Sequence, residues 1–361
     1  MNYKALCYYL GLFCFPISIA AFINILYSSY FDYFLSFNSY VITLVVSFLV
    51  GTAFFLIGKN SVKKINFIEQ LFLIILVYLL AASLISLPFY LSNYQVTFIN
   101  SVFESISGIT GTGFSIFANI KYLDPTLIIW RSSSQWVGGL YFLIFLVLIF
   151  SNKQFSFKMN DLTFSGEGGI NSEENIKQIS FKIFVLYSLL SLMIFIFLNI
   201  SEVRMFNSLN LSMTLISTGG FLPTDTLGKI INTNPKKIVL IFSFFISLLN
   251  FFLIYNIFDK KIIIREHRED FYIIILAIIL ILLVYLNNYS GLNIIISVLS
   301  SLSNSGITLI NSDNNLGLYF ILIAAIGGSL ISNTSGIKLT RICSWSLPVF
   351  LSLQRWYTEG E

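Results

Sequence analysis

Charged side chains are scarce in this sequence of 361 residues: Asp, Glu, Lys and Arg make up only 11%, whereas 56% of the residues are hydrophobic. A soluble domain carries about 25% charged residues, so this chain has too few charges to cover a surface in water. The mean hydropathy of +0.84 points the same way. The scarcity of charge excludes an ordinary soluble protein and indicates an integral membrane protein.

Histidine and cysteine are nearly absent. The one histidine, His267, lies in a charged stretch, and the three cysteines, Cys7, Cys14 and Cys343, have neither metal-ligand nor disulfide spacing. No apolar segment places a nucleophile beside a base. The net charge is only +4, and 37 Phe and 19 Tyr accompany the 21 Lys and Arg residues, which is no basis for nucleic-acid binding. We therefore expect no enzyme, no transition-metal site and no nucleic-acid partner.

Long apolar runs make up most of the chain. Eight segments reach, or nearly reach, the roughly 20 residues that a helix needs to cross a bilayer: 5–29, 40–58, 67–91, 125–150, 181–200, 237–258, 271–287 and 316–337. The first is too long for the apolar core of a signal peptide and has no convincing cleavage site after it, so we expect a retained helix. Three shorter and more polar segments, 98–109, 205–217 and 291–303, each lie between two spans.

The basic residues indicate an orientation. If the N-terminus lies in the cytoplasm, fifteen of the 21 Lys and Arg residues fall in inner loops; the other six are Lys121, Arg131, Arg204, Lys229, Lys236 and Lys237. Inner loops of membrane proteins carry an excess of Lys and Arg. We therefore predict a multi-pass protein with a cytoplasmic N-terminus, whose three short segments enter the membrane from the outer side.

A glycine-containing turn follows each short segment, and the three turns can be aligned. They read Ile109-Thr110-Gly111-Thr112-Gly113-Phe114, Ile216-Ser217-Thr218-Gly219-Gly220-Phe221 and Leu302-Ser303-Asn304-Ser305-Gly306-Ile307. The last glycines of the turns are 107 and 86 positions apart. The order of span, short helix, turn and span is therefore a repeat of whole modules.

Turns of this kind are suited to binding a cation. Non-helical backbone at membrane depth is tolerated only where protein buries it or where it lines a watery cavity, and glycine permits backbone angles that direct carbonyl groups into such a cavity. A ring of carbonyl oxygens can replace the hydration shell of K⁺, and the C-terminal ends of the short helices add a favourable partial negative charge. Small residues also pack helices together in membranes, so a single turn would more often indicate packing, whereas three matching turns favour an ion site.

Four segments carry a resemblance to a known family. Residues 103–113 resemble the first pore helix and filter of the Trk/Ktr/HKT superfamily of cation transporters, and the string 130–139 (Trp-Arg-Ser-Ser-Ser-Gln-Trp-Val-Gly-Gly) resembles the start of the helix that follows. The turn 216–221 resembles the second filter, and the turn 303–306 is a looser version of the third. The resemblance is closest to the bacterial Trk-type potassium-transporting membrane subunit and covers most of residues 67–341.

The resemblance implies an all-α polytopic membrane protein. The expected parts are two N-terminal transmembrane helices (1–66), a first span–pore helix–span module (67–155), a cytoplasmic loop (156–178), a second module (179–260), a third module with a broken last helix (261–341) and a C-terminal tail (342–361). The family has four modules with re-entrant filter turns, whereas this sequence holds three. We therefore expect that another polypeptide completes the ring or that the sequence is a fragment.

The resemblance also assigns a potassium-selective filter, coordinated mainly by backbone carbonyls, to these residues of the three turns: Thr110, Gly111, Thr112, Gly113, Ser217, Thr218, Gly219, Gly220, Asn304, Ser305 and Gly306. A serine in place of the first filter's glycine tends to accompany sodium permeation in the superfamily, so Gly113 favours potassium. Asp225 and Asp313 would attract cations at the outer mouth, although solvated loop charges are the commoner explanation. Glu104 is expected to form a structural ion pair with Arg131.

A polar interruption of the last span resembles the family's intramembrane gate. The gate residues would be Gly327, Gly328, Ser332, Asn333, Thr334, Ser335, Gly336 and Lys338. Polar backbone cannot face lipid, so this loop must face a cavity. Lys338 would place a movable cation near the conduction path, or would simply extend to the inner interface; its position in the sequence is compatible with both.

We therefore predict potassium uptake across the bacterial inner (plasma) membrane through a carbonyl filter gated by an intramembrane loop. The alternative is a truncated non-conducting relative, or a sodium-permeable one, that acts only in assembly with other chains. The resemblance implies a homodimer in membrane lipid and a separate cytoplasmic nucleotide-binding regulatory subunit. No cofactor is expected on the chain itself, because the glycines of the inner loop 151–180 lack the ending of a phosphate-binding loop.

Overall fold

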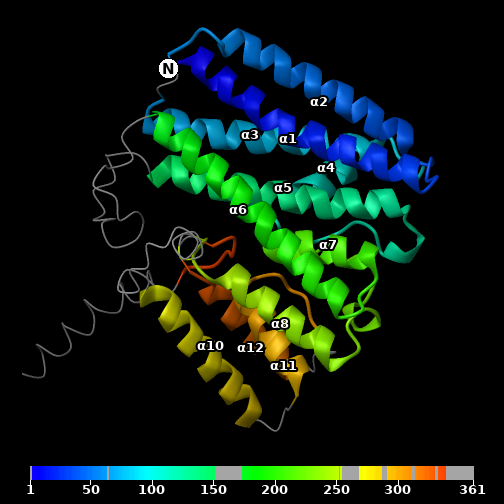
Figure 1. The fold of residues 1–361 in the computed structure, drawn as a ribbon, viewed down its shortest axis with the longest axis vertical. Coiled ribbons are helices and arrows are strands. Elements are labelled where there is room, and N and C mark those ends of the chain that lie inside the picture. The colour runs from blue at the N-terminus through cyan, green and yellow to red at the C-terminus, as the bar shows by residue number, and fades with distance from the viewer. Residues whose placement is uncertain are drawn as a thin grey trace, which may run out of the picture. The chain divides into compact units, whose positions relative to one another are not determined.

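The computed structural model of the chain describes residues 2–62, 65–150, 173–251, 253, 268–286, 291–309, 314–329 and 332–338. All regular elements within these ranges are helices (Figure 1), as the sequence predicts. The chain divides into two compact units, of which one runs up to Ile231 and the other begins at Asn232.

The first unit contains long and short helices in the predicted order. The long ones are α1 (Tyr3–Tyr30), α2 (Phe37–Gly58), α3 (Phe67–Tyr90), α5 (Pro125–Phe150) and α6 (Glu173–Ile200), and the short ones are α4 (Phe98–Ile109) and α7 (Met205–Ile216). All five long helices are apolar enough over at least 18 residues to cross a membrane. Two 3-10 turns, η1 (Ile120–Tyr122) and η3 (Leu227–Lys229), lie in the connections after the short helices.

The second unit contains α8 (Asn234–Leu248), α10 (Arg268–Leu286), α11 (Leu292–Leu302) and α12 (Asn314–Ile326). The predicted span 237–258 is not one continuous helix: α8 ends at Leu248, Leu249 has an extended backbone with ψ 158°, and the Asn250 amide donates to Asp270 Oδ1 at 2.7 Å. This side-chain acceptor replaces the helical carbonyl partner of Asn250. The predicted span 316–337 is helical only to Ile326, in keeping with its polar interruption.

The predicted module boundaries remain predictions. The division between the two compact units falls inside the predicted second module 179–260, between α7 and α8. The predicted cytoplasmic loop 156–178 lies mostly outside the described residues, and α6 begins within it at Glu173. The predicted tail 342–361 lies entirely outside them.

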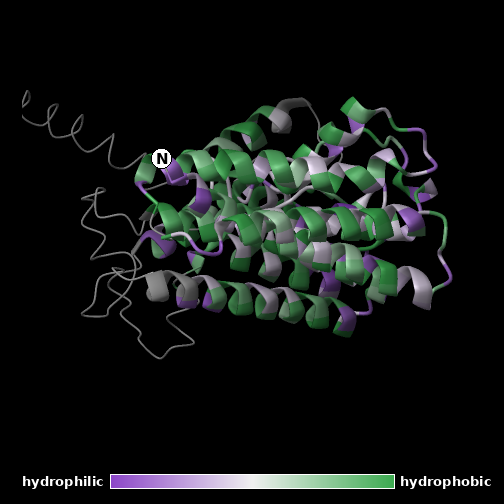
Figure 2. Ribbon diagram, turned by 90° about the horizontal axis from the view of Figure 1, so that it is seen from above, coloured by the Kyte–Doolittle hydropathy of each residue, from purple (hydrophilic) through white to green (hydrophobic). Residues whose placement is uncertain are grey.

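The polarity of α2 is that of a helix in lipid. Its buried positions are small or polar: Ser39, Tyr40, Thr43, Ser47, Gly51 and Gly58. Its exposed side chains include Phe48, Leu49, Leu56 and Ile57, each at least half exposed. In Figure 2 hydrophobic residues run along the helices, and hydrophilic ones gather toward their ends and connections. Helices in a bilayer pack through small residues because lipid already solvates the apolar ones.

Glycines allow α1 and α2, which run side by side (Figure 1), to approach closely. A Cβ atom added at Gly11 would lie 2.6 Å from Phe55 N and 2.7 Å from Gly51 O, both backbone atoms of α2. The hydroxyls of Ser18 and Ser47 are hydrogen-bonded at 2.8 Å across the same interface. This interface therefore depends on the absence of a side chain at position 11.

We expect Gly11→Ala to destabilise the protein, because the added methyl group meets backbone rather than a flexible side chain; overpacking of this kind costs about 1–3 kcal/mol. The measurement is the midpoint of thermal unfolding of the purified protein in detergent. Gly317→Ala is the matched control, since Gly317 also lies in a helix, but no atom is within 4 Å of an added Cβ there. Equal midpoints for the two variants would argue against the close approach of α1 and α2.

Candidate functional site

The chain reverses direction after α4 through a Schellman turn. Thr110 ends the helix, and Gly111 has a left-handed backbone with φ +69°. The amide of Gly111 donates to Gly108 O at 3.0 Å, and the amide of Thr112 donates to Ser107 O at 3.0 Å. These are the two bonds that define the motif and satisfy the last carbonyls of a helix.

The other two short helices end in the same turn. After α7, Thr218 has φ +54°, and the amides of Thr218 and Gly219 donate to Leu215 O and Thr214 O at 3.2 and 2.9 Å. After α11, Asn304 has φ +61°, and the corresponding bonds, to Ser301 O and Ser300 O, measure 3.1 and 3.0 Å. The repeat inferred from sequence is thus a repeat of backbone geometry.

Thr218 is unusual in this set. A β-branched residue with positive φ is a rare outlier, and such strain persists only where the surroundings impose it, most often at functional sites. The aligned positions carry Gly111 and Asn304, both of which accept a left-handed backbone readily. The second turn therefore keeps its shape against the preference of its own residue.

In each of the first two turns, a hydroxyl of the short helix bonds to the chain segment that follows the turn, which we call its outgoing leg. Ser107 Oγ donates to Phe114 O at 2.5 Å, and Thr214 Oγ1 donates to Phe221 O at 3.0 Å. In the third turn the aligned hydroxyl, Ser300, instead contacts Ser305 Oγ at 2.9 Å. The first two turns are thus more alike than either is to the third.

The carbonyl oxygens of residues 110–113 accept no hydrogen bond from the described part of the chain. The polar contacts of this stretch run through its amides and through the hydroxyls of Thr110 and Thr112, which are 2.7 Å apart. Backbone oxygens at membrane depth need a polar partner. A row of such oxygens can supply ligands to a cation.

The first and second turns meet within the first unit, although 107 residues separate their last glycines. A Cβ atom added at Gly113 would lie 2.7 Å from Gly220 Cα and 3.0 Å from Gly220 N. One added at Gly111 would lie 3.7 Å from Ser217 O. Two of the three predicted filter segments, 110–113 and 217–220, are therefore in backbone contact. Asn304, Ser305 and Gly306 belong to the second unit.

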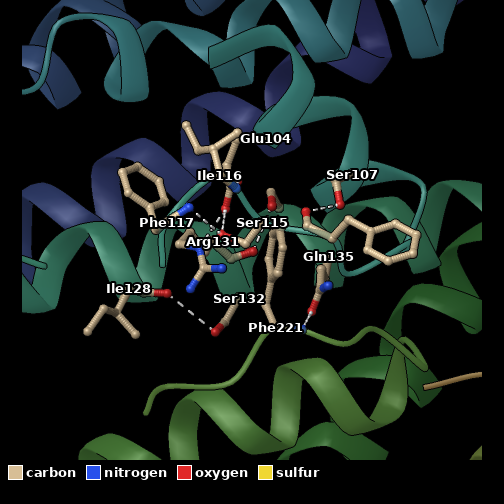
Figure 3. Close-up of polar contacts among 12 residues, drawn as sticks. Glu104, Ser107, Ser115, Ile116, Phe117, Ile128, Arg131, Ser132, Gln135 and Phe221 are labelled. Atoms are coloured by element: carbon tan, nitrogen blue, oxygen red, sulfur yellow. Dashed lines mark hydrogen bonds and ion pairs between the residues drawn. The ribbon is translucent and has the colours of Figure 1, made fainter. Parts of the chain in front are cut away.

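The expected ion pair between Glu104 and Arg131 is present and fully buried. Arg131 Nε lies 2.8 Å from Glu104 Oε1, and the two side chains are 1% and 0% exposed. Glu104 also accepts bonds from Ser115 Oγ at 3.0 Å and from Ile116 N at 2.8 Å (Figure 3). The carboxylate of α4 thereby anchors the outgoing leg of the first turn as well as α5.

Arg131 also contacts the second turn. Its guanidinium lies over the ring of Phe221, 4.2 Å from the ring centroid, and Gln135 Oε1 accepts a bond from Phe221 N at 3.3 Å (Figure 3). Gln135 lies in the string 130–139, but its residue type and position in the sequence predict no role for it. The one sequence feature that could have indicated its role is its position four residues after Arg131, which places both side chains on one face of α5.

Polar contacts also join α5 to both short helices. Ser132 Oγ donates to Asn210 Oδ1 of α7 at 2.8 Å, and Gly138 lets α5 approach the end of α4, where an added Cβ would overlap Ile109 O. Both contacts are buried. The helix that follows the first turn therefore supports the first and second turns together.

The predicted gate segment in the second unit is a non-helical loop closed on itself. The amides of Ile337 and Lys338 donate to Ala325 O and Ile326 O at 2.9 Å. Lys338 is buried, and its Nζ donates to Ser332 Oγ at 3.3 Å, to Thr334 Oγ1 at 2.8 Å and to Thr334 O. The ammonium group therefore points into the loop.

The loop is held at its other end by α8. The Ser329 amide donates to Leu248 O at 3.1 Å, and the Gly328 amide donates to Thr334 Oγ1 at 3.0 Å. Gly327 and Gly336 have φ values of +75° and +94°. Among the other predicted gate residues, Ser332 is buried and Asn333 partly buried, whereas Ser335 and Gly336 are exposed.

Asp225, predicted at the outer mouth, connects two loops of the first unit. Its Oδ1 accepts from Ile120 N at 2.8 Å, and its Oδ2 lies 3.8 Å from Lys229 Nζ. These contacts engage the carboxylate with a backbone amide and a lysine of the first unit. Asp313 lies outside the described residues.

Tyr94 connects the loop between α3 and α4 to the start of α5. Its hydroxyl accepts from Asp124 N at 2.6 Å and donates to Tyr122 O at 3.2 Å. Desolvation raises the pKa of Tyr94 above its usual value. The phenol stays a neutral donor there, beside the carboxylate of Asp124 that caps α5 through Thr126.

These features define a class of protein: an all-helical, multi-pass membrane protein in which short helices end in glycine turns, two of which are in backbone contact. No model of a known protein family matches the chain. In sequence it is 26% identical over 284 residues to an uncharacterized cation transporter of Methanocaldococcus jannaschii, covering 74% of this chain and 56% of that protein. It is 23% identical over 253 residues to the Trk system potassium uptake protein TrkG of Escherichia coli, covering 65% and 50%.

The fold matches the crystal structure of the potassium transporter TrkH from Vibrio parahaemolyticus with a TM-score of 0.83, over 99% of this chain and 77% of that one, at 18% identity. The chain is therefore a homologue of the Trk-type potassium and cation transporters, which confirms the resemblance seen in its motifs. This is a family of transporters and not of enzymes. The chain spans about half the length of the curated relatives it matches first.

Proposed function

We propose that the chain forms part of a potassium-uptake pathway across the plasma membrane, in which carbonyl oxygens of the glycine turns coordinate the ion. The observation that carries this proposal is the backbone contact between the first and second turns at Gly113 and Gly220. Two segments that are far apart in sequence bring rows of backbone carbonyls together at the ends of short helices. Carbonyl rings of this kind replace the hydration shell of K⁺.

The electrostatics of the turns favour a cation over an anion. The short helices α4 and α7 both end at the turns, so their partial negative ends lie there. Neither turn contains Lys or Arg, and the buried Arg131 is already paired with Glu104. Glycine at position 113 supports potassium over sodium through the resemblance to the superfamily.

We also propose that the loop 327–338 serves as the gate of this pathway. Gly327 and Gly336 have left-handed backbones, and the ammonium of Lys338 bonds to Ser332 and Thr334 within the loop. One side chain therefore joins the polar residues of this loop. Under this proposal the loop would adopt a second, open arrangement in which the Lys338 contacts are broken. The third turn, in the same unit, would add carbonyls of Asn304, Ser305 and Gly306 to the filter.

We further propose a cytoplasmic N-terminus, a homodimer in lipid, a cytoplasmic nucleotide-binding regulatory subunit, and a fourth module from further sequence or another polypeptide. Two relatives are named as a cation transporter and a potassium uptake protein, which supports a cation as the transported ion. The alternative is a relative that conducts no ions, or passes sodium, and acts only in assembly.

The test is rubidium uptake, with sodium as competitor, in cells that lack their own potassium uptake. The chain is expressed alone and also with a fourth span–pore helix–span module appended. We expect saturable uptake that prefers rubidium, at least in the extended form. Gly228→Ala should leave it unchanged, because Gly228 has open space around it.

Two results would reject the proposal. One is the absence of rubidium uptake in both forms despite correct membrane insertion, which would favour the non-conducting alternative. The other is uptake that sodium suppresses as effectively as potassium does, which would favour the sodium-permeable one.

A further inference from the structure

We propose that Arg131 and Gln135 are positioning residues for ion selectivity: from α5 they hold the backbone of the second turn against the first. The inference rests on the proposed function and names the side chains that set the geometry of its site. Neither residue supplies a ligand to the ion. Both act through Phe221 and Gly219, which flank the contact glycine Gly220.

Three contacts fix Phe221: one at its backbone amide, one at its carbonyl and one at its ring. Its amide donates to Gln135 Oε1 at 3.3 Å, its carbonyl accepts from Thr214 Oγ1 at 3.0 Å, and its ring lies under the Arg131 guanidinium at 4.2 Å. The side chain is 1% exposed. The residue directly after Gly220 therefore has little freedom to move, and two of its three anchors come from α5.

Gln135 also fixes the residue before Gly220. A Cβ atom added at Gly219 would overlap the amide group of Gln135, so the glutamine side chain fills the space beside the Gly219 backbone. Gln135 thus contacts the turn on both sides of Gly220. The strained backbone of Thr218, with φ +54°, lies one residue earlier, and an imposed conformation of this kind needs such outside support.

Arg131 connects this support to the first turn. Through Glu104 it is joined to Ser115 and Ile116, which follow the first turn directly. Through the ring of Phe221 it contacts the end of the second turn. One guanidinium thereby joins the segments that follow both turns (Figure 3). The glycines of these turns meet at Gly113 and Gly220.

Two buried donors indicate that this arrangement is not optimised for stability alone. Arg131 Nη1 and Gln135 Nε2 have no hydrogen-bond partner in the described part of the chain. Buried hydrogen-bond donors without a partner are rare in native structures, so each of them needs a physical explanation. A leucine or methionine would fill either place without an unpaired donor, whereas only the polar groups can hold Phe221 N and stack on its ring. Selectivity depends on the number and placement of coordinating carbonyls.

The experiment is a double-mutant cycle between Arg131→Lys and Phe221→Leu in the form of the chain that takes up rubidium. Lysine keeps the charge opposite Glu104 but loses the planar group that stacks on an aromatic ring, and leucine removes the ring. Trp130→Phe is the control: Trp130 neighbours Arg131 on α5 and is equally buried, but its indole donates to Ile85 O of α3 at 3.0 Å.

We expect each single variant to lower the rubidium-to-sodium uptake ratio about fivefold to tenfold, and the double variant to lower it no further, because both changes break the same contact. Trp130→Phe should lose stability but keep the ratio. An unchanged ratio in folded single variants, a multiplied effect in the double variant, or an equal fall in the control would each overturn the proposal.

A second readout works without transport. Hydrogen exchange of the purified protein reports the amides of Gly219 and Phe221, which are bonded to Thr214 O and Gln135 Oε1. Both amides should exchange faster in Arg131→Lys and in Phe221→Leu, but not in Trp130→Phe. If neither the chain nor its extended form takes up rubidium, the proposed function fails, whereas unchanged exchange in these variants would separately refute the positioning role.

Discussion

Replacing Gly113 by asparagine should abolish selective rubidium uptake, whereas the same replacement at Gly111 should leave most of it intact. Both glycines have left-handed backbones, with φ +81° and +69°. Asparagine accepts that conformation, and Asn304 already occupies the position aligned with Gly111, at φ +61°. Backbone strain is therefore similar in the two variants, and their surroundings make the difference.

The surroundings differ sharply. At Gly113 an added Cβ would meet the backbone of Gly220 at 2.7 Å, a distance at which one of the two turns must move. At Gly111 the nearest atom, Ser217 O, lies at 3.7 Å, which is ordinary contact. Overpacking against backbone costs about 1–3 kcal/mol, and here the displaced atoms belong to the proposed filter itself.

The measurement is rubidium uptake with and without sodium, normalised to the amount of protein in the membrane. The thermal midpoint of each purified variant separates lost function from lost folding. Equal uptake and equal selectivity in the two variants would mean that the contact between the turns is not needed for transport.

Replacing Glu104 by alanine should be among the most damaging single changes in the chain. It leaves the buried Arg131 without its carboxylate and removes the acceptor for Ser115 Oγ and Ile116 N. Breaking a buried pair by removing one partner costs about 3–5 kcal/mol, since an uncompensated charge remains. We expect an apparent melting temperature in detergent lowered by several degrees or a chain that fails to fold.

Removing both charges should be less harmful than removing one. The double variant Glu104→Leu with Arg131→Met fills the space with apolar groups, and such replacements of buried pairs are often neutral or stabilising. We expect its melting temperature to recover toward that of the wild type, while selective transport stays lost because Ser115, Ile116 and Phe221 are no longer held.

Asp225→Asn is the matched control for this series. Asp225 also accepts a backbone amide bond and has a basic partner, but its side chain is 29% exposed and the partner is 3.8 Å away. Exposed pairs contribute about 0–1 kcal/mol. A melting temperature for Glu104→Ala that matches the one for Asp225→Asn would show that the buried pair contributes nothing special to stability.

The helices of this protein were predictable because lipid imposes a simple rule on sequence. A helix must be apolar over about 20 residues to cross, so the spans at α1, α2, α3, α5 and α6 appear directly in the residues. The short helices were also predictable, since each is too short to span and precedes a polar turn with glycine. The end of α8 at Leu248 was not, because an apolar sequence continues past it and the Asp270 side chain that bonds to Asn250 lies 20 residues further on.

The candidate site was predictable in its parts but not in its assembly. The pair of Glu104 and Arg131 could be expected, because two opposite charges within apolar surroundings need each other. The role of Gln135 could not, since its partner, Phe221, lies 86 positions away along the chain. For Lys338, position in the sequence could not predict that its ammonium bonds to Ser332 and Thr334 within the loop.

The sequence by itself determined that the chain is helical, lies in a membrane, and repeats a short helix followed by a polar glycine turn. Those properties follow from local composition and periodicity, which act over one or two helical turns. Only the tertiary structure decided that Gly113 meets Gly220 and that one arginine of α5 joins both turns. Contacts between segments about a hundred residues apart depend on how whole helices pack, and one residue pattern is compatible with many such packings.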